Sequence, residues 1–218
     1  MKFPKKLKCV IFDMDGVIID SEEIHKKAYY ETFKNLGVEV SEELYKTMTG
    51  SSTINAFQKL VNHFNLNDIP EELVLQKRKC YVNYFENDPT LSLVNGVKEL
   101  IQFLYKQNLT LVLASSSAMV NINRVFSRFD LNKYFTAKIS GADLTASKPH
   151  PEIFEKATIL GGVSKEHCIV VEDSDNGIKA ANQAGVFVIG FKNPLSKDQT
   201  LINADLIIEN FSELKKLL

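Results

Sequence analysis

Cysteine is scarce in this chain of 218 residues, which contains only Cys9, Cys80 and Cys168. Their number is odd, and no two of them have the spacing of a zinc-ligand pair, which argues against a disulfide framework and a zinc site. Cys9 and Cys168 lie in apolar, strand-like runs, and Cys80 lies in an expected helix. We therefore interpret the three cysteines as buried free thiols.

The sequence also lacks an excess of charge of either sign, since 26 Lys and Arg residues face 27 Asp and Glu residues. A nearly neutral chain without a basic stretch gives no reason to expect a nucleic-acid partner. Long hydrophobic runs are absent near the N-terminus too. The lysines of residues 1–8 are followed by an apolar stretch of only residues 9–12, which is too short for a signal peptide or a membrane span. We expect a cytoplasmic protein that binds no membrane and acts as a monomer.

The chain does contain short apolar runs rich in β-branched residues. These runs cover residues 7–12, 109–114, 135–140, 168–171, 186–190 and 206–208. Continuous apolarity without alternation is typical of parallel strands that are covered on both faces. Helical periodicity separates the runs after residue 94. This alternation predicts an α/β fold with a doubly wound parallel sheet, that is, a Rossmann-like core.

A second region, residues 18–93, interrupts this alternation. Its patterns predict successive helices near residues 22–36, 42–47, 52–64 and 70–87, with no convincing strand. A block of this length is no simple crossover, so we expect an inserted α-helical cap domain over the carboxyl edge of the sheet, where ligands bind. The predicted domains are therefore a catalytic core of residues 1–17 and 94–218 and a helical cap of residues 18–93.

The motif Asp13-Met14-Asp15-Gly16 directly follows the first expected strand. One carboxylate of such a pair can attack phosphorus, and the second can protonate the leaving oxygen and later activate water. The pair needs a cation beside it, because a phosphate dianion would otherwise be repelled. Asp-x-Asp also occurs in surface turns and calcium loops, so this motif alone does not establish a function.

Two further clusters could bind a phosphate. Ser115-Ser116-Ser117 follows the second strand, where hydroxyl groups and helix N-terminal amides can hold an anion. Serine is also an ordinary helix cap, and from the triplet alone we favour that interpretation. Lys148 precedes Pro149 in a segment with few conformations, so its ammonium group could neutralise a nucleophile and a phosphoryl group. The alternative is an exposed lysine in a turn.

An acidic cluster, Glu172-Asp173, ends the strand of residues 168–171. Facing Asp13 across neighbouring strands, it would complete an oxygen-only site of the kind that Mg²⁺ prefers. The alternative is a negatively charged helix N-terminus, for which Ser174 or Asp175 would suffice. Glu172 beside Asp173 exceeds what helix capping requires.

The order and spacing of these four clusters along the whole chain resemble the four motifs of the haloacid dehalogenase-like phosphotransferase superfamily. The helical insertion and the stretches 16–22 and 148–154 look like those of its β-phosphoglucomutase and sugar-phosphatase branch. The resemblance implies Mg²⁺ as cofactor and a small-molecule phosphate ester as substrate.

The resemblance also implies roles for single residues in the core. Asp13 matches the nucleophile, which also binds the metal, and Asp15 matches the general acid and base, with its backbone carbonyl on the metal. Lys148 matches the lysine that neutralises charge. Asp173 matches the remaining protein ligand of the metal, and Glu172 contacts the metal directly or through another ligand.

The remaining residues that the resemblance singles out concern the substrate. Ser115 matches the phosphate-binding hydroxyl, and Ser116 and Gly16 lie beside the same phosphate. His25 matches a histidine near the hinge of the mutases, and Gly50 matches a glycine of their cap loop.

The sequence departs from the mutases where a mutase differs from a phosphatase. A mutase must hold a bisphosphate and needs a second cationic clamp. Residues 49–53, Thr-Gly-Ser-Ser-Thr, replace a lysine and an arginine, and Ala118 stands near the place of another lysine. We therefore predict a Mg²⁺-dependent phosphatase of small phosphomonoesters, sugar or polyol phosphates, that forms an aspartyl-phosphate.

Three other functions are weighed against the phosphatase. A β-phosphoglucomutase is the alternative within the family, and it would require cap lysines such as Lys26, Lys27 or Lys77 to reach the substrate. Dehalogenation is not expected, since that branch lacks the second aspartate that Asp15 supplies. A non-catalytic phosphate-binding module is the alternative from another class.

Overall fold

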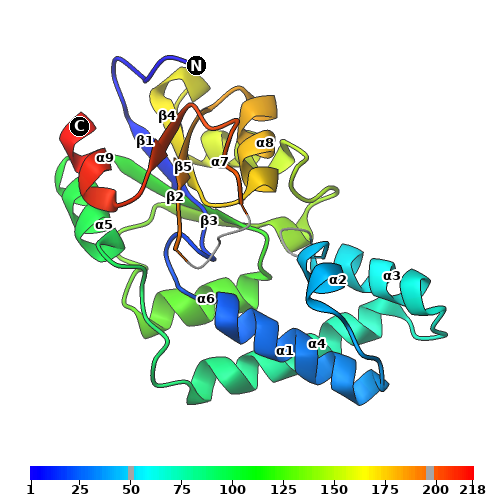
Figure 1. Ribbon diagram of the computed structural model, residues 1–218. Coiled ribbons are helices and arrows are strands. Elements are labelled where there is room, and N and C mark those ends of the chain that lie inside the picture. The colour runs from blue at the N-terminus through cyan, green and yellow to red at the C-terminus, as the bar shows by residue number, and fades with distance from the viewer. Residues whose placement is uncertain (49–51, 195–198) are drawn as a thin grey trace. The chain divides into compact units, whose positions relative to one another are not determined.

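The computed structural model describes residues 1–48, 52–194 and 199–218 (Figure 1). The chain forms two compact units. Residues 1–20 and 92–218 form the first, called here the core unit, and residues 21–91 form the second, called the helical unit.

The core unit contains a parallel sheet of six strands in the order β3-β2-β1-β4-β5-β6. The strands are β1 (Cys9–Phe12), β2 (Thr110–Ser115), β3 (Ala137–Ser140), β4 (Cys168–Glu172), β5 (Phe187–Phe191) and β6 (Leu206–Ile208). All six expected strands are present, so the predicted doubly wound α/β fold is confirmed. The strand order reverses between β1 and β4, and ligands bind at such a reversal in open α/β sheets.

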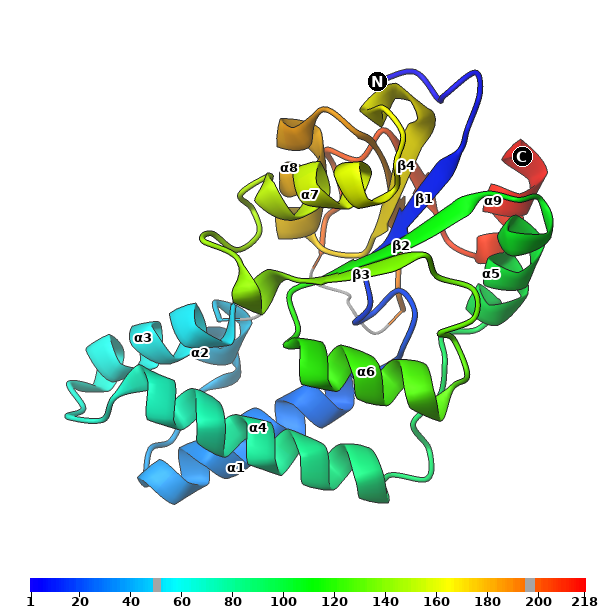
Figure 2. The same ribbon diagram turned by 180° about the vertical axis from the view of Figure 1, so that it is seen from behind.

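Helices cover both faces of this sheet (Figure 2). They are α5 (Val97–Lys106), α6 (Met119–Arg128), α7 (Glu152–Leu160), α8 (Asp175–Ala184) and α9 (Phe211–Leu217). Helices α7 and α8 bury Phe154 and Ala181 against alternate strand residues such as Ile11 and Val170. Helices α5 and α9 lie on the opposite face. Every residue of β1 and β4 is buried, which explains why the apolar runs show no alternation.

The segments at the two ends of the insertion are paired with each other within the core unit. Ile19 and Leu93 form an antiparallel bridge. The N–H of Asp20 donates to the carbonyl of Ser92 at 3.2 Å, and that of Val94 donates to the carbonyl of Ile18 at 3.0 Å. The chain therefore leaves and re-enters the core unit at neighbouring positions.

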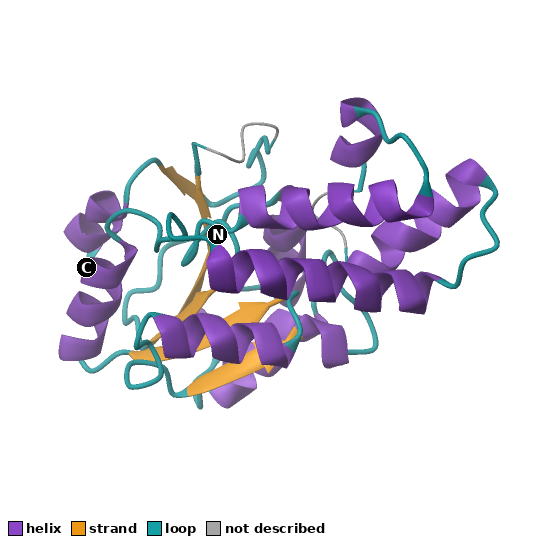
Figure 3. Cartoon of the chain, turned by 90° about the horizontal axis from the view of Figure 1, so that it is seen from below, coloured by secondary structure: helices purple, strands orange, loops and turns teal. Residues whose placement is uncertain are grey.

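The helical unit consists of helices and loops in its described residues (Figure 3). Its helices are α1 (Glu22–Leu36), α2 (Glu42–Lys46), α3 (Thr53–Phe64) and α4 (Pro70–Asn87). Aromatic residues dominate its own core, with Phe33 and Phe57 buried against Tyr29 and Tyr45. Its function as a cap stays a prediction. Among the described residues of the whole chain, no helix has the length and apolarity needed to cross a bilayer.

The cysteines are free thiols, as expected. Cys9 and Cys168 are in-register partners on β1 and β4 and are fully buried. Cys80, on α4, is only half-buried, so the expectation that it is buried is wrong.

Candidate active site

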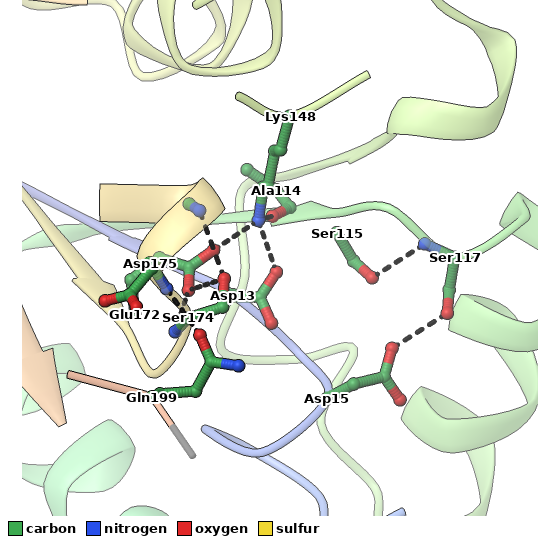
Figure 4. Close-up of polar contacts among 11 residues, drawn as sticks. Asp13, Asp15, Ala114, Ser115, Ser117, Lys148, Glu172, Ser174, Asp175 and Gln199 are labelled. Atoms are coloured by element: carbon green, nitrogen blue, oxygen red, sulfur yellow. Dashed lines mark hydrogen bonds and ion pairs between the residues drawn. The ribbon is translucent and has the colours of Figure 1, made fainter. Parts of the chain in front are cut away.

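Parallel pairing brings the carboxyl ends of three adjacent strands together. Asp13 follows β1, Ser115 ends β2, and Glu172 ends β4 with Asp173 directly after it. Phe12 of β1 is in register with Leu113 of β2 and with Val171 of β4, so these polar residues begin at the same edge of the sheet. Figure 4 shows Asp13, Ser115 and Glu172 in one cluster with Lys148.

Lys148 is buried at the centre of this cluster, with 6% of its surface exposed. Its Nζ donates to Asp13 Oδ1 at 2.6 Å, to Glu172 Oε1 at 2.6 Å and to the carbonyl of Ala114 at 3.2 Å. A lysine ammonium group has three protons, and these three acceptors engage all of them. The alternative interpretation of Lys148 as an exposed turn lysine is therefore wrong.

The charges of the cluster act on one another strongly because little water reaches them. Burial raises the pKa of Asp13 to about 8; Lys148 opposes this shift, while Glu172 and Asp15 add to it. Burial alone would lower the pKa of Lys148, but the carboxylates of Asp13 and Glu172 outweigh burial and raise it. The two carboxylates therefore favour the charged form of Lys148, and positive charge near Asp13 favours the charged form of Asp13.

The carboxylates fit a hard divalent cation. Oxygen atoms of Asp13, Glu172 and Asp173 lie within 4.8 Å of one another, and all three residues are buried. Oxygen-only donor sets of this kind suit Mg²⁺. The ammonium group of Lys148 contacts two of these carboxylates, and a divalent cation would add positive charge that favours the ionised form of Asp13.

Glu172 is held by its neighbours in the core unit. Its Oε1 accepts from Lys148, and its Oε2 accepts from the backbone N–H and the hydroxyl of Ser174, each at 2.9 Å. A Cβ at Gly177 would lie 1.7 Å from Glu172 Oε1, so only glycine leaves room for this carboxylate. Glu172 thus fixes Lys148, and it also belongs to the group of three carboxylates that could hold a metal ion.

The alternative that the acidic cluster merely caps a helix is only partly right. Ser174 caps α8 by accepting from the N–H of Gly177 at 3.1 Å. The carboxylate of Asp175 instead accepts from the N–H groups of Thr200 and Leu201, at 3.2 and 2.8 Å. Capping therefore explains Ser174 and leaves Glu172 and Asp173 to the site.

The serine triplet does not cap α6, so the interpretation favoured from the triplet alone is wrong. The N-cap of α6 is Ala118, without a side-chain cap. Ser115 Oγ accepts from the N–H of Ser117 at 3.0 Å, and Ser117 Oγ donates to Asp15 Oδ2 at 2.8 Å. Sequence reasoning did not single out Ser117, because three adjacent serines give no sign of which one faces Asp15. Ser116 is exposed after the end of β2.

Gly16 is required by the geometry of its turn. Its φ of 82° lies in the left-handed region, and a Cβ would lie 2.0 Å from Asp173 Oδ2. Its carbonyl accepts from Asn193 Nδ2 at 2.9 Å. These contacts account for glycine at this position, and its proximity to a phosphate stays a prediction.

The two remaining candidate residues belong to the helical unit. His25, on α1, has its Nδ1 2.7 Å from Nζ of Lys77 on α4. Lys77 is 3% exposed, and its Nζ lies 4.6 Å from the centre of the Tyr29 ring and 5.3 Å from that of Tyr81. The helical unit thus has a buried lysine beside His25. The role of His25 in substrate binding stays a prediction. Gly50 lies outside the described residues.

Comparisons with known proteins identify the family. The model of the haloacid dehalogenase-like hydrolases matches residues 10–191. A phosphorylated carbohydrates phosphatase of Thermotoga maritima is 27% identical over 92% of this chain and 93% of that protein. A β-phosphoglucomutase of Bacillus subtilis is 28% identical over 95% of this chain and 92% of that protein.

Solved structures agree with these sequence matches. A HAD hydrolase, family IA, variant 3, of Entamoeba histolytica has a TM-score of 0.82 at 27% identity and covers 95% of both chains. The family match runs from β1 to the end of β5 and therefore includes all of the strand ends that meet at Lys148. This chain belongs to the haloacid dehalogenase-like hydrolase family, and it is a phosphohydrolase.

Proposed function

We propose that this enzyme is a Mg²⁺-dependent phosphatase of small phosphomonoesters, sugar or polyol phosphates, that acts through an aspartyl-phosphate on Asp13. The observation that carries the proposal is the contact of Asp13 with Lys148, 2.6 Å long and almost completely shielded from water. Such a contact keeps a carboxylate and a cation together where a phosphoryl group would bring more negative charge.

In this proposal, each step of the reaction is assigned to a residue of this chain. An oxygen of Asp13 attacks phosphorus while Lys148 offsets the charge on the phosphoryl oxygens. The hydroxyl of Ser115 holds one of these oxygens. Asp15 gives its proton to the leaving alkoxide and then takes a proton from the water that hydrolyses the aspartyl-phosphate. The hydrogen bond from Ser117 keeps the carboxyl group of Asp15 in one orientation.

Mg²⁺ would be held by the carboxylates of Asp13 and Asp173 and the backbone carbonyl of Asp15. When bound, it would supply positive charge to the transferring phosphoryl group. The pKa of Asp13, raised by burial to about 8, supports this assignment, because a nucleophile must be ionised to attack.

Metal removal is the first test of this proposal. We expect phosphate release to stop in a chelator and to return when Mg²⁺ is added in excess, while Ca²⁺ does not restore it, because Ca²⁺ requires more ligands and longer bonds. Phosphate is measured colorimetrically with a panel of sugar and polyol phosphates. Undiminished release in the chelator would show that the acidic cluster needs no metal.

The second candidate is a β-phosphoglucomutase, and two observations favour it. One is the buried Lys77 beside His25 in the helical unit, a cation that could hold a second phosphate. The other is the Bacillus subtilis relative, a β-phosphoglucomutase. Against it, Ser52 and Thr53 at the start of α3 carry no charge, and neither does Ala118 before α6.

An assay of product partition separates the two candidates. The enzyme receives β-glucose 1-phosphate with a trace of the 1,6-bisphosphate, and inorganic phosphate is counted against glucose 6-phosphate. We expect phosphate to dominate, since water reaches the aspartyl-phosphate before a second sugar phosphate binds. Isomerisation that exceeds phosphate release by orders of magnitude would make the enzyme a mutase.

Lys77→Gln identifies the cation responsible if isomerisation dominates. The matched control is Lys59→Gln, which changes an exposed lysine of α3 in the same unit. Loss of isomerisation in the first variant alone would assign the second phosphate to Lys77.

A further inference from the structure

We propose that Asn193 is a positioning residue that fixes the turn after Asp13 and thereby sets the affinity of the enzyme for Mg²⁺. This inference rests on the metal site of the proposed function. Asn193 lies two residues after β5, in a part of the sequence that contains none of the four motif clusters.

The backbone holds Asn193 firmly in place. The N–H of Lys192 donates to the carbonyl of Ile208 at 2.8 Å, and the N–H of Asn193 donates to that of Phe191 at 2.9 Å. The side chain is 5% exposed, and its Nδ2 donates to the carbonyl of Gly16 at 2.9 Å across 177 residues of sequence. The end of β5 is thus attached to the turn that carries Asp13 and Asp15.

Two hydrogen bonds fix the two peptide groups on either side of Gly16. The N–H of Gly16, which shares its peptide group with the carbonyl of Asp15, donates to the carbonyl of Ile19 at 2.9 Å. The carbonyl of Gly16, in the next peptide group, accepts from Asn193. Since a peptide group is planar, fixing its N–H also fixes its C=O, here the carbonyl of Asp15 that is assigned to the metal.

The same turn also supports the other metal ligand. A Cβ on Gly16 would overlap the carboxylate of Asp173, so the α-carbon of Gly16 packs directly against that carboxylate. A turn that shifts by a fraction of an ångström therefore changes both the carbonyl of Asp15 and the space for Asp173. Asn193 acts on both ligands through its hydrogen bond to the carbonyl of Gly16.

The size of the expected effect can be taken from supporting contacts at other metal sites. Residues that orient metal ligands typically contribute about 10–100-fold to metal affinity or activity. Without the amide of Asn193, the buried carbonyl of Gly16 loses this hydrogen-bond donor, and the turn can shift so that the carbonyl finds another donor. We expect Mg²⁺ to bind at least about tenfold more weakly.

Calorimetric titration of the whole protein with Mg²⁺, in the absence of substrate, measures this effect directly. The variants are Asn193→Ala and Asn193→Leu; leucine keeps the number and branching of the side-chain heavy atoms of asparagine without a donor, and so leaves no cavity if alanine fails to fold. The matched control is Asn182→Ala, because Asn182, on α8, also donates through its Nδ2 to a distant carbonyl, that of Asn203 at 2.8 Å, but this hydrogen bond is exposed. Melting temperatures are recorded for all variants.

The expected result is a dissociation constant for Mg²⁺ that rises at least about tenfold in a folded Asn193 variant and stays unchanged in Asn182→Ala. An equal rise in the control, or unchanged binding in a folded Asn193 variant, overturns the inference and leaves the proposed phosphatase intact. No Mg²⁺ binding by the parent protein overturns the metal site itself and the inference with it.

Discussion

The Asp13→Asn variant is expected to release no detectable phosphate while it keeps the fold and melting behaviour of the parent. An amide nitrogen cannot serve as the nucleophile, so the covalent step is lost. The fold tolerates the change, because asparagine retains an oxygen that can accept from Lys148, and Lys148 keeps the carboxylate of Glu172 and the carbonyl of Ala114 as partners. Phosphate release and thermal melting are measured side by side.

The control for this variant is Asp143→Asn, which neutralises an exposed aspartate of the same unit. Its activity should equal that of the parent. Beryllofluoride, which mimics an acyl-phosphate, should bind the parent on Asp13 and should not bind Asp13→Asn. Residual turnover of the asparagine variant well above background would eliminate the covalent mechanism.

Lys148→Ala is expected to have the second largest effect, on both rate and stability. Loss of one such electrostatic contact typically lowers kcat by about 10²–10³-fold. The change also leaves Asp13 and Glu172 buried without their cation, and removal of one partner of a buried ion pair costs roughly 3–5 kcal/mol. Denaturant unfolding and steady-state kinetics measure the two effects, with Lys148→Met as the variant that retains more of the side-chain volume.

Lys156→Ala is the control for this second prediction. Lys156 pairs with Glu152 at 2.6 Å on the exposed side of α7, where an ion pair contributes about 0–1 kcal/mol. We expect nearly unchanged rate and stability in this variant. If Lys148→Ala stays within a few-fold of the parent in kcat, Lys148 has no part in the chemistry.

Much of the core of this enzyme could be predicted because parallel strands all end in the same direction. Six apolar runs were enough to expect the sheet, and in a parallel sheet the residues after Phe12, Ala114 and Val171 lie at one edge. The proximity of Asp13 and Asp173 could therefore be predicted from the topology of the sheet alone.

Contacts that depend on side-chain direction could not be predicted in this way. Glu172 was expected to contact the metal directly or through another ligand, and that stays a prediction; its contact with Lys148, which depends on the space beside Gly177, was not expected. Asn193 gave no signal, because a single asparagine after a strand resembles any turn residue. The pairing of His25 with Lys77 joins two helices across 52 residues of sequence, and no local pattern connects them.

The paired segments that join Ile18–Asp20 to Ser92–Val94 have a consequence for how this enzyme could have arisen. When the two ends of an insertion lie side by side, the rest of the fold stays continuous with or without it. Such a fold can therefore gain, lose or exchange the insertion as one piece. All of the residues assigned to the phosphoryl chemistry lie outside the inserted segment. Natural selection could thus replace the inserted helical unit of such an enzyme and leave the residues assigned to its chemistry unchanged.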